Sequence, residues 1–363
     1  MKTQFNAAMR RATELVRSGD LSAATDLIRS SLSSAPETAG ATAAPTPGAA
    51  RKSPRRGLGQ TLSDLAARMP KGMPGSPAEE APLPEGASFD AGTFACAAGS
   101  RDYRVYVPQM SGAPKGMILM LHGCTQSPVD FANGTGMNRL ADQHGLIVVY
   151  PAQPRSANMN ACWNWFQSGD QERDAGEPAI LAGMARELRD RHQVPSSQVF
   201  VAGLSAGAAM AVILGRTYPE LFAGVGVHSG LPYKAANTAP AAFAAMGGSP
   251  AAAQPTPARP LPTIVFHGSD DRTVDVVNGS RIAEEARPGG AEVIDGGNAG
   301  GRSFTRTSVL SEADKPMMEF WRVEGLGHAW SGGDSSGSHT DPQGPDASAE
   351  MVRFFLDLPR RGE

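Results

Sequence analysis

Short runs of consecutive apolar residues alternate with helical patterns from about residue 88 onward. A strand that is apolar on both faces has to be covered on both faces, as in a parallel sheet with helices on either side. The predicted strands of this kind are Gly116–Leu121, Leu146–Tyr150, Val199–Ala202, Gly224–His228, Thr263–Phe266 and Met318–Val323, and the predicted helices are Pro178–His192, Ala206–Tyr218 and Ala347–Leu356. The pattern therefore predicts an α/β fold with a mainly parallel sheet and helices on both faces.

Other segments depart from this alternation. Thr93–Ala97 and Tyr103–Val107 precede it, and we expect them to form an antiparallel edge of the sheet. Residues 234–260 are rich in Ala and Pro, and residues 285–303 are rich in Gly. Both segments are predicted to be insertions or loops.

The first 86 residues differ from the rest of the chain. Apolar residues recur at helical spacing on both sides of Gly19 and Asp20, which predicts a helical hairpin over residues 1–34. Residues 35–86 are rich in Pro and Ala and contain a basic cluster, so we expect a linker with one short helix. The α/β domain then occupies residues 87–363. A single hairpin buries little surface, so we expect it to dock on a partner, on its own copy or on the main domain.

Charge is distributed unevenly along the chain. The net charge is -3 at pH 7, but residues 1–72 carry 11 Lys and Arg against 5 Asp and Glu. The front of the chain is therefore basic and the remainder acidic, which favours an anionic surface as the partner of the N-terminal segment. No nucleic-acid motif accompanies this charge, so nucleic acid is not an expected partner.

Composition limits the class of protein further. Hydrophobic residues make up 40% and charged residues 19% of the chain, and no uncharged apolar run reaches about 18 residues, so we expect a globular protein without a transmembrane segment. Met1–Gly19 lacks the apolar core of a secretory signal, which makes the cytoplasm the default expectation. The three cysteines follow no metal-ligand spacing, so neither a metal nor a cofactor is expected.

A sharp turn joins one predicted strand to one predicted helix. Val199–Ala202 leads into Gly203-Leu204-Ser205-Ala206-Gly207, and an Ala-rich helical pattern follows at once. A nucleophile elbow needs this arrangement, because the strained turn exposes the serine hydroxyl above the sheet and small neighbours allow close backbone approach. A second Gly-x-Ser-x-Gly match at Ser335 has neither strand nor helix beside it, so Ser205 is the predicted nucleophile.

A nucleophilic serine needs a base and a carboxylate that orients the base, in the chain order Ser, Asp or Glu, His. Asp270 and Asp271 follow the predicted strand Thr263–Phe266, and His328 follows the predicted strand Met318–Val323. Polar residues at the carboxyl ends of neighbouring strands collect at one edge of such a sheet. We therefore predict His328 as the base and favour Asp271 over Asp270 as the acid.

An oxyanion hole needs two N–H donors, one from the residue after the nucleophile and one from the loop after the third strand. Ala206 supplies the first, and Cys124 in the loop Leu121–Gln126 is the predicted second. Trp330, Trp163 and Gln126 are the predicted substrate-binding residues, with Trp330 the foremost candidate for lining a cleft.

The cysteines of two loops flank this predicted site. We expect Cys124 and Cys162 to lie close enough to form a disulfide in an oxidising environment and to remain thiols in a reducing cytoplasm, with Cys96 free in either case.

Taken together, these motifs resemble the esterases of the poly(3-hydroxybutyrate) depolymerase type, which are related to feruloyl and acetylxylan esterases of the α/β-hydrolase fold. The resemblance extends from about Tyr103 to Phe355. It rests on Leu121-His122-Gly123-Cys124-Thr125-Gln126, Cys162-Trp163-Asn164-Trp165-Phe166, Gly203-Leu204-Ser205-Ala206-Gly207, His267-Gly268-Ser269-Asp270-Asp271 and Gly325-Leu326-Gly327-His328-Ala329-Trp330-Ser331-Gly332-Gly333.

The resemblance implies that residues 87–363 form a catalytic domain with the triad Ser205, Asp271 and His328, acting on short-chain hydroxyalkanoate or aromatic esters. Secreted relatives carry a signal peptide and often a binding module, and we see neither here. We therefore expect an intracellular esterase that acts on hydroxybutyrate oligomers or granule polymer, with its N-terminal segment on the granule surface. The alternatives are an extracellular location, a feruloyl or acetylxylan type of carbohydrate esterase, and an inactive granule-associated or scaffolding protein.

Overall fold

The computed structural model describes residues 78–250, 260–311 and 313–358. The hairpin predicted over residues 1–34 lies outside the described residues, as does most of the linker 35–86 with its short helix. Residues 78–87 have no helix or strand and lead into the sheet.

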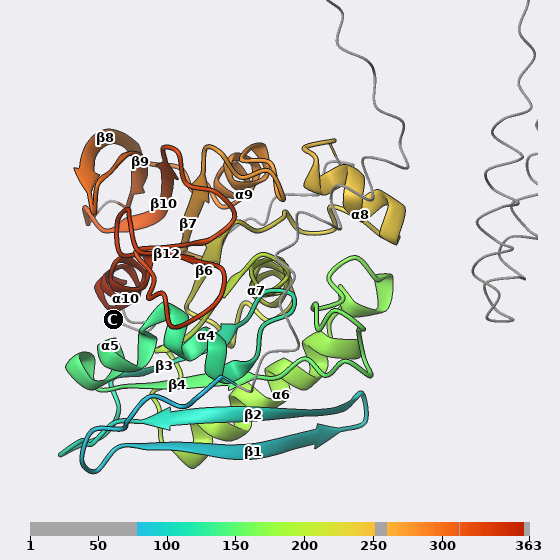
Figure 1. Ribbon diagram of the computed structural model, residues 1–363, viewed down its shortest axis with the longest axis vertical. Coiled ribbons are helices and arrows are strands. Elements are labelled where there is room, and N and C mark those ends of the chain that lie inside the picture. Colours follow the sequence, from blue (N-terminus) through green and yellow to red (C-terminus); the bar gives the residue numbers. More distant parts are fainter. Residues whose placement is uncertain (1–77, 251–259, 312, 359–363) are drawn as a thin grey trace, which may run out of the picture. The chain divides into compact units, whose positions relative to one another are not determined.

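Within the described residues, ten strands form one sheet in the order β1-β2-β4-β3-β5-β6-β7-β10-β9-β8 (Figure 1). The strands from β4 to β10 in this order pair in parallel, which confirms the mainly parallel sheet. They are β4 (Leu146–Pro151), β3 (Gly116–Leu121), β5 (Val199–Leu204), β6 (Gly224–His228), β7 (Thr263–Gly268) and β10 (Pro316–Val323). Side chains alternate between two core layers: Met117, Leu119 and Leu121 face one, and Ile118 and Met120 face the other.

Antiparallel pairs lie at both edges of this sheet (Figure 1). The expected pair is β1 (Ser88–Cys96) with β2 (Gly99–Val107). The second is a hairpin of β8 (Ala291–Ala299) and β9 (Arg302–Leu310), with β9 antiparallel to β10. Residues 285–303, predicted to be an insertion or a loop, therefore contain part of an inserted hairpin, and the alternative of a loop was wrong. The sequence of β8 has no alternation of apolar and polar residues, and eight of its nine residues are exposed. Its backbone pairing with β9 therefore holds this strand in the sheet.

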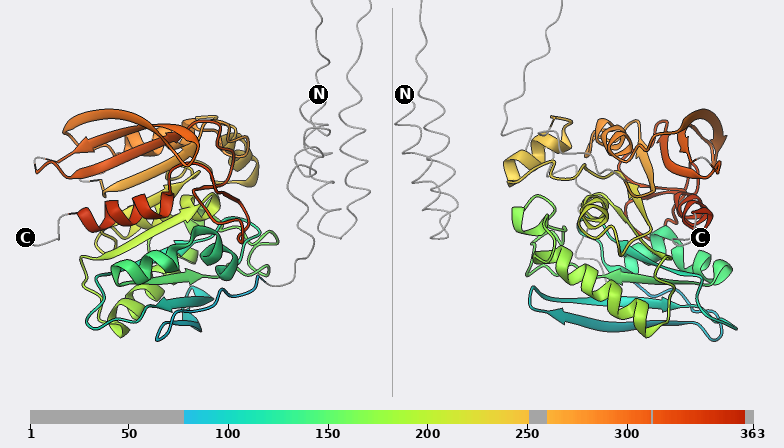
Figure 2. Two further views of the ribbon diagram at one scale, coloured as in Figure 1. Left: turned by 60° about the vertical axis from the view of Figure 1, so that its left-hand side comes forward. Right: turned by 180° about the vertical axis from the view of Figure 1, so that it is seen from behind.

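Helices cover both faces of the sheet (Figure 2). The layer packed on one face contains α6 (Gly176–Arg191), α7 (Ala206–Thr217), α8 (Ala239–Met246) and α9 (Val277–Glu285). The opposite layer contains α4 (Pro128–Thr135), α5 (Met137–His144) and α10 (Ala347–Asp357). Four of these helices, α4, α5, α8 and α9, were not predicted; each has eight or nine residues and so offers little periodicity to read.

The insertion predicted over residues 234–260 contains α8, which Thr238 caps by accepting a hydrogen bond from the Ala241 N–H. The remaining elements are the single turn η1 (Ser168–Asp170) and a short parallel pair, β11 (Trp330–Ser331) with β12 (Thr340–Asp341). None of the described helices has the length and apolar character needed to cross a membrane.

Candidate active site

Ser205 lies in a strained turn between β5 and α7. Its backbone has φ 57° and ψ -117°, and its N–H donates to the carbonyl of His228 over 2.9 Å. A Cβ added to Gly207 would lie 2.0 Å from the Leu121 carbonyl oxygen, so only glycine permits this approach of α7 to β3. The local sequence therefore produces the predicted elbow, with the serine at the carboxyl end of β5.

The carboxylate of Asp271 lies just beyond β7 and is held from two sides. Its Oδ1 accepts the backbone N–H groups of Thr273 and Val274 at 2.9 Å each, and its Oδ2 lies 2.7 Å from His328 Nδ1. Burial alone would raise the pKa of Asp271, but the hydrogen bonds from His328 and Val274 outweigh it and lower the pKa below its usual value. The Asp270 side chain is exposed, and within the described residues its carboxylate accepts only from Ser269 Oγ, so the structure pairs Asp271 with the histidine.

His328 lies in the loop between β10 and β11. Because a carboxylate can only accept, Nδ1 carries the proton in the bond to Asp271, which leaves Nε2 as an acceptor. This is the tautomer that a general base requires. Among the residues that the structure describes, no hydrogen bond joins Ser205 Oγ to His328, so the structure brings together the acid and the base but does not hydrogen-bond the base to the serine.

In the loop after β3, the Cys124 N–H has no acceptor among the described residues and can bind a ligand. The Gly123 N–H donates to Gln126 Oε1 at 2.8 Å, and the Thr125 N–H donates to the Asn160 carbonyl at 2.7 Å. Within the described chain, no acceptor takes the N–H of Cys124 between them, nor that of Ala206 at the start of α7. These are the two groups predicted to form an oxyanion hole.

His122 fixes the start of this loop from the core. Its Nε2 accepts the Gln153 N–H at 3.1 Å, and its Nδ1 donates to the Gly123 carbonyl at 2.7 Å. Burial lowers the pKa of His122 to about 4, so the ring is neutral at neutral pH. It serves as a structural hydrogen-bonding group behind the loop.

The three residues predicted to bind substrate are buried. Trp330 is 1% exposed, Trp163 0% and Gln126 5%. The Trp330 indole donates to Ser348 Oγ, the Trp163 indole to the His122 carbonyl, and the Gln126 amide to Asp130 and the Ser338 carbonyl. Each polar group is therefore satisfied inside the protein, and a role of these three residues in substrate binding stays a prediction.

His228, at the end of β6, is a residue of the site that the sequence did not single out. Its carbonyl accepts from Ser205, its Nε2 accepts the Ser331 N–H at 3.0 Å, and its ring stacks on Trp330 at 5.1 Å. Burial lowers its pKa to about 3, so the ring stays neutral. His228 thus joins the elbow, through its backbone carbonyl, to β11, through its ring. His228 precedes the acid in the chain order Ser, Asp, His, and no motif marks it in the sequence.

A disulfide joins the loop of residues 121–126, called the oxyanion loop after its predicted role, to the loop before η1. Cys124 and Cys162 are bonded with a Cα–Cα distance of 4.2 Å, and Cys96 is free and exposed, which confirms the predicted pairing. Among the described residues, no group of three His, Cys, Asp or Glu side chains is arranged to hold a metal ion.

We expect Cys162→Ser to lower the free energy of unfolding by roughly 2–4 kcal/mol, because the bond closes a loop between residues 38 apart in the sequence. Chemical denaturation without reductant measures the change, and Cys96→Ser serves as the control that leaves it unaltered. An unchanged unfolding free energy for Cys162→Ser would mean that the bond does not form in solution.

The chain is similar to known ester hydrolases. A family model described as esterase PHB depolymerase matches residues 101–287. Poly(3-hydroxyalkanoate) depolymerase C from Paucimonas lemoignei is 32% identical over 70% of this chain and 62% of its own length. A probable acetylxylan esterase A from Neosartorya fischeri is 31% identical over 47% of this chain and 50% of its own length.

A solved structure shares the fold. The acetyl xylan esterase from Aspergillus awamori has a TM-score of 0.51 at 20% sequence identity, covering 71% of this chain and 94% of that chain. This similarity confirms the α/β-hydrolase fold expected from the sequence. The chain spans less than two thirds of the length of the depolymerase that it matches.

Proposed function

Because the chain belongs to the esterase PHB depolymerase family, we propose that it is a serine esterase that uses Ser205, His328 and Asp271. The observation that carries this proposal is the 2.7 Å contact of His328 Nδ1 with Asp271, at the same sheet edge as a strained serine elbow. The two free N–H groups of Cys124 and Ala206 support it further.

In the proposed reaction, His328 Nε2 takes the proton of Ser205 Oγ as the oxygen attacks the ester carbonyl carbon. The Cys124 and Ala206 N–H groups stabilise the tetrahedral oxyanion, and Asp271 stabilises the imidazolium. When the intermediate collapses, His328 returns the proton to the leaving alcohol and an acyl-serine remains. Water then attacks the acyl carbon, and the same steps release the acid and restore the serine hydroxyl. The bond between the histidine and the serine has to form when substrate binds, as catalytic hydrogen bonds often do.

We propose hydroxyalkanoate esters, either polymer or oligomer, as the substrate class. The similarity to poly(3-hydroxyalkanoate) depolymerase C extends over more of this chain than the similarity to the acetylxylan esterase, and this difference supports the choice. An acetyl or feruloyl ester of a carbohydrate is the second candidate. An inactive scaffolding protein is the candidate from another class.

A fluorophosphonate probe tests the reaction, and an ester panel tests the substrate. We expect the probe to modify Ser205, located by mass spectrometry of the labelled peptide. We also expect hydroxybutyrate trimer or emulsified poly(3-hydroxybutyrate) to be hydrolysed faster than methyl ferulate or acetylated xylan. Absence of both labelling and hydrolysis would favour the scaffolding protein, whereas labelling with a preference for acetylated xylan or methyl ferulate would favour the carbohydrate esterase.

The N-terminal segment is proposed to hold the enzyme to an anionic, partly apolar surface such as a granule coat, since residues 1–72 are basic and carry apolar helical patterns. The structure indicates where a truncation should end. Glu80 forms an ion pair with Arg104 on β2, and the Glu79 carbonyl accepts from Asn133 on α4. Removal of residues 1–77 therefore keeps the contacts made by residues 79 and 80.

We expect this truncation to leave hydrolysis of p-nitrophenyl butyrate unchanged, because every proposed catalytic group lies in the retained part. Co-sedimentation with granules should fall at low ionic strength, and the difference from the full chain should vanish in about 1 M salt, where charge is screened within ~3 Å. Equal granule binding by both forms would refute the proposed anchor. Loss of soluble-ester activity would show that the segment belongs to the folded enzyme.

The disulfide bears on where the enzyme acts. Disulfides persist in oxidising compartments, so the Cys124–Cys162 bond favours the extracellular alternative over the cytoplasm. Alkylation of acid-quenched native cells distinguishes the two, because a cytoplasmic protein would be trapped with both thiols modified.

A further inference from the structure

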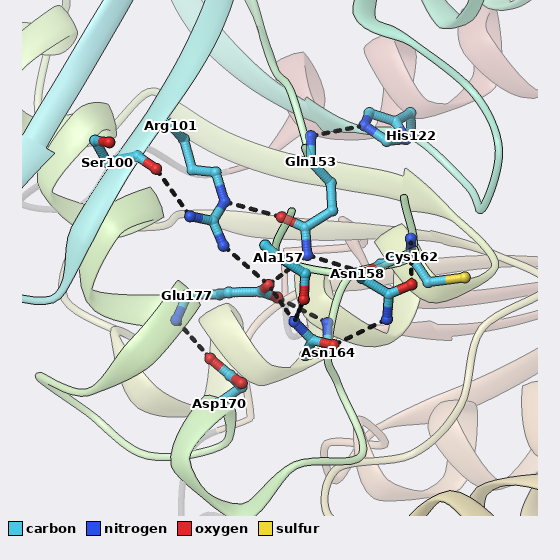
Figure 3. Close-up of polar contacts among 10 residues, drawn as sticks. All are labelled: Ser100, Arg101, His122, Gln153, Ala157, Asn158, Cys162, Asn164, Asp170 and Glu177. Atoms are coloured by element: carbon cyan, nitrogen blue, oxygen red, sulfur yellow. Dashed lines mark hydrogen bonds and ion pairs between the residues drawn. The ribbon is translucent and has the colours of Figure 1, made fainter. Parts of the chain in front are cut away.

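A buried carboxylate lies behind the oxyanion loop and is absent from the proposed reaction. Glu177, in the first turn of α6, is 2% exposed and accepts hydrogen bonds from three side chains and one backbone N–H (Figure 3). Arg101 Nη2 is 3.1 Å from Oε1, Gln153 Nε2 2.5 Å and Asn164 Nδ2 2.8 Å, and the Asn164 N–H is 2.8 Å from Oε2. The donors come from β2, from the segment after β4 and from the loop before η1, so this carboxylate joins three parts of the chain.

These contacts determine the conformation of the loop 157–164. Asn164, held by Glu177, accepts from Asn158 Nδ2 at 2.9 Å, and Asn158 Oδ1 in turn accepts the Asn160 N–H at 3.0 Å. Gln153 Nε2, which donates to Glu177, also donates to the Cys162 carbonyl at 2.9 Å. The loop has no helix or strand of its own, so side-chain bonds take the place of a backbone ladder (Figure 3).

The loop 157–164 in turn holds the oxyanion loop at three points. The Asn160 carbonyl accepts the Thr125 N–H at 2.7 Å, the Trp163 indole donates to the His122 carbonyl at 3.1 Å, and Cys162 is bonded to Cys124. These three contacts surround the free Cys124 N–H. A shift of the loop 157–164 therefore moves the proposed oxyanion donor.

We propose that Glu177 is a positioning residue for the oxyanion hole, acting through Asn164 and Gln153 on the loop 157–164 and through that loop on the Cys124 N–H. This inference rests on the proposed function. Glu177 makes no contact with Ser205 or His328 in the structure, so its effect is indirect.

A buried glutamate is costly to retain unless its hydrogen bonds serve a purpose that a neutral residue cannot serve. Burial raises the pKa of Glu177, and the nearby Asp170 carboxylate raises it further. A glutamine at this position has the same shape, but its amide nitrogen is a donor. Every neighbouring group that bonds the Glu177 carboxylate is also a donor, so this nitrogen would face N–H groups that it cannot bond. The glutamine also leaves the Arg101 guanidinium without its charge partner.

The test compares Glu177→Gln with Glu319→Gln in the full chain. Glu319, on β10, is also 2% exposed and is also paired with an arginine: it accepts from Arg353 Nη2 at 2.6 Å and from the Trp321 indole at 2.9 Å. It makes none of the contacts to the oxyanion loop. A purely structural effect of removing a buried charge should therefore be similar in the two variants.

We expect Glu177→Gln to lower kcat for p-nitrophenyl butyrate by roughly 10- to 100-fold, because displacement of a donor by about 1 Å can cost 10²-fold. KM should change by less than about 3-fold, since the oxyanion exists only after attack. The rate of phosphonylation of Ser205 should fall in parallel with kcat. Glu319→Gln should alter kcat by less than about 3-fold, even where it lowers Tm as much.

Hydrogen exchange gives a second readout that does not require activity. We expect faster exchange of the Thr125 N–H and of peptides covering residues 120–127 and 157–165 in Glu177→Gln, and no change there in Glu319→Gln. If Glu177→Gln fails to fold, Asn164→Ala takes its place, since it frees Asn158 but leaves Glu177 bonded to Arg101 and Gln153.

Equal losses of kcat in the two glutamate variants, or unchanged exchange of the 120–127 peptide, would overturn the positioning role. If the unmodified protein hydrolyses no ester and takes no phosphonate label, the proposed function fails on its own, and the exchange data still decide whether Glu177 holds the loop.

Discussion

Replacement of Ser205 with Ala is expected to lower kcat by a factor on the order of 10⁴ or more, because it removes the nucleophile of the proposed acyl transfer. The fold should be retained, since the backbone bond from residue 205 to the His228 carbonyl does not involve the side chain. Initial rates on p-nitrophenyl butyrate measure the loss, and Tm shows that the variant remains folded.

Ser335→Ala is the matched control, because Ser335 is the serine of the second Gly-x-Ser-x-Gly match. It is exposed in a turn between β11 and β12, with no helix behind it. Its activity should equal that of the unmodified protein. The opposite result, an inactive Ser335→Ala and an active Ser205→Ala, would assign the nucleophile to the other serine.

The second large effect is expected for Asp271→Asn, with a loss of kcat approaching ~10⁴-fold. The amide nitrogen of asparagine would donate to His328 Nδ1, which places the histidine proton on Nε2, where it blocks proton transfer from Ser205. The bonds from Thr273 and Val274 to the other oxygen can persist, so the loop geometry should survive. Asp270→Asn provides the control and should be mild. Equal and severe losses would leave the two acids undistinguished, and a loss at Asp270 alone would reverse the assignment.

The same substitution has a pH signature. The pKa of Asp271 is lower in the folded protein than its usual value, so its contribution to stability is present above the unfolded pKa and is lost as pH falls through the folded pKa. We therefore expect Asp271→Asn to lower the free energy of unfolding at neutral pH and to have a smaller effect in strong acid. Denaturation midpoints of both proteins, measured from neutral pH to strong acid, show whether the loss of stability in Asp271→Asn becomes smaller as the pH falls. A deficit that grows in acid would contradict the ionised state of this carboxylate.

Where a strand is apolar on both faces, the sequence predicted it well. The bounds of β3 and β6 are those expected, and β5 differs only by extending to Leu204. The pairing of His328 with Asp271 could likewise be anticipated, because both residues lie in loops at the carboxyl ends of strands that are neighbours in a parallel sheet.

Features that depend on tertiary contacts were not readable in this way. The strand β8 is exposed along most of its length, so nothing in its composition separates it from a loop. Trp330 and Gln126 lie beside catalytic motifs in the sequence, yet they point into the core, and adjacency in sequence carries no information about side-chain direction. Glu177 has no motif, because its partners come from segments that meet only in the fold.

The distances in sequence between bonded groups of the site have a consequence for biosynthesis. Gln126, which shapes the oxyanion loop, donates to the carbonyl of Ser338, 212 residues later, and His228 accepts from Ser331, 103 residues later. Contacts so remote form late, after the intervening parallel strands have assembled. The acid and base cannot meet until β10 and the loop after it have left the ribosome. A nascent chain is therefore expected to lack the proposed pair of acid and base until His328 has been synthesised.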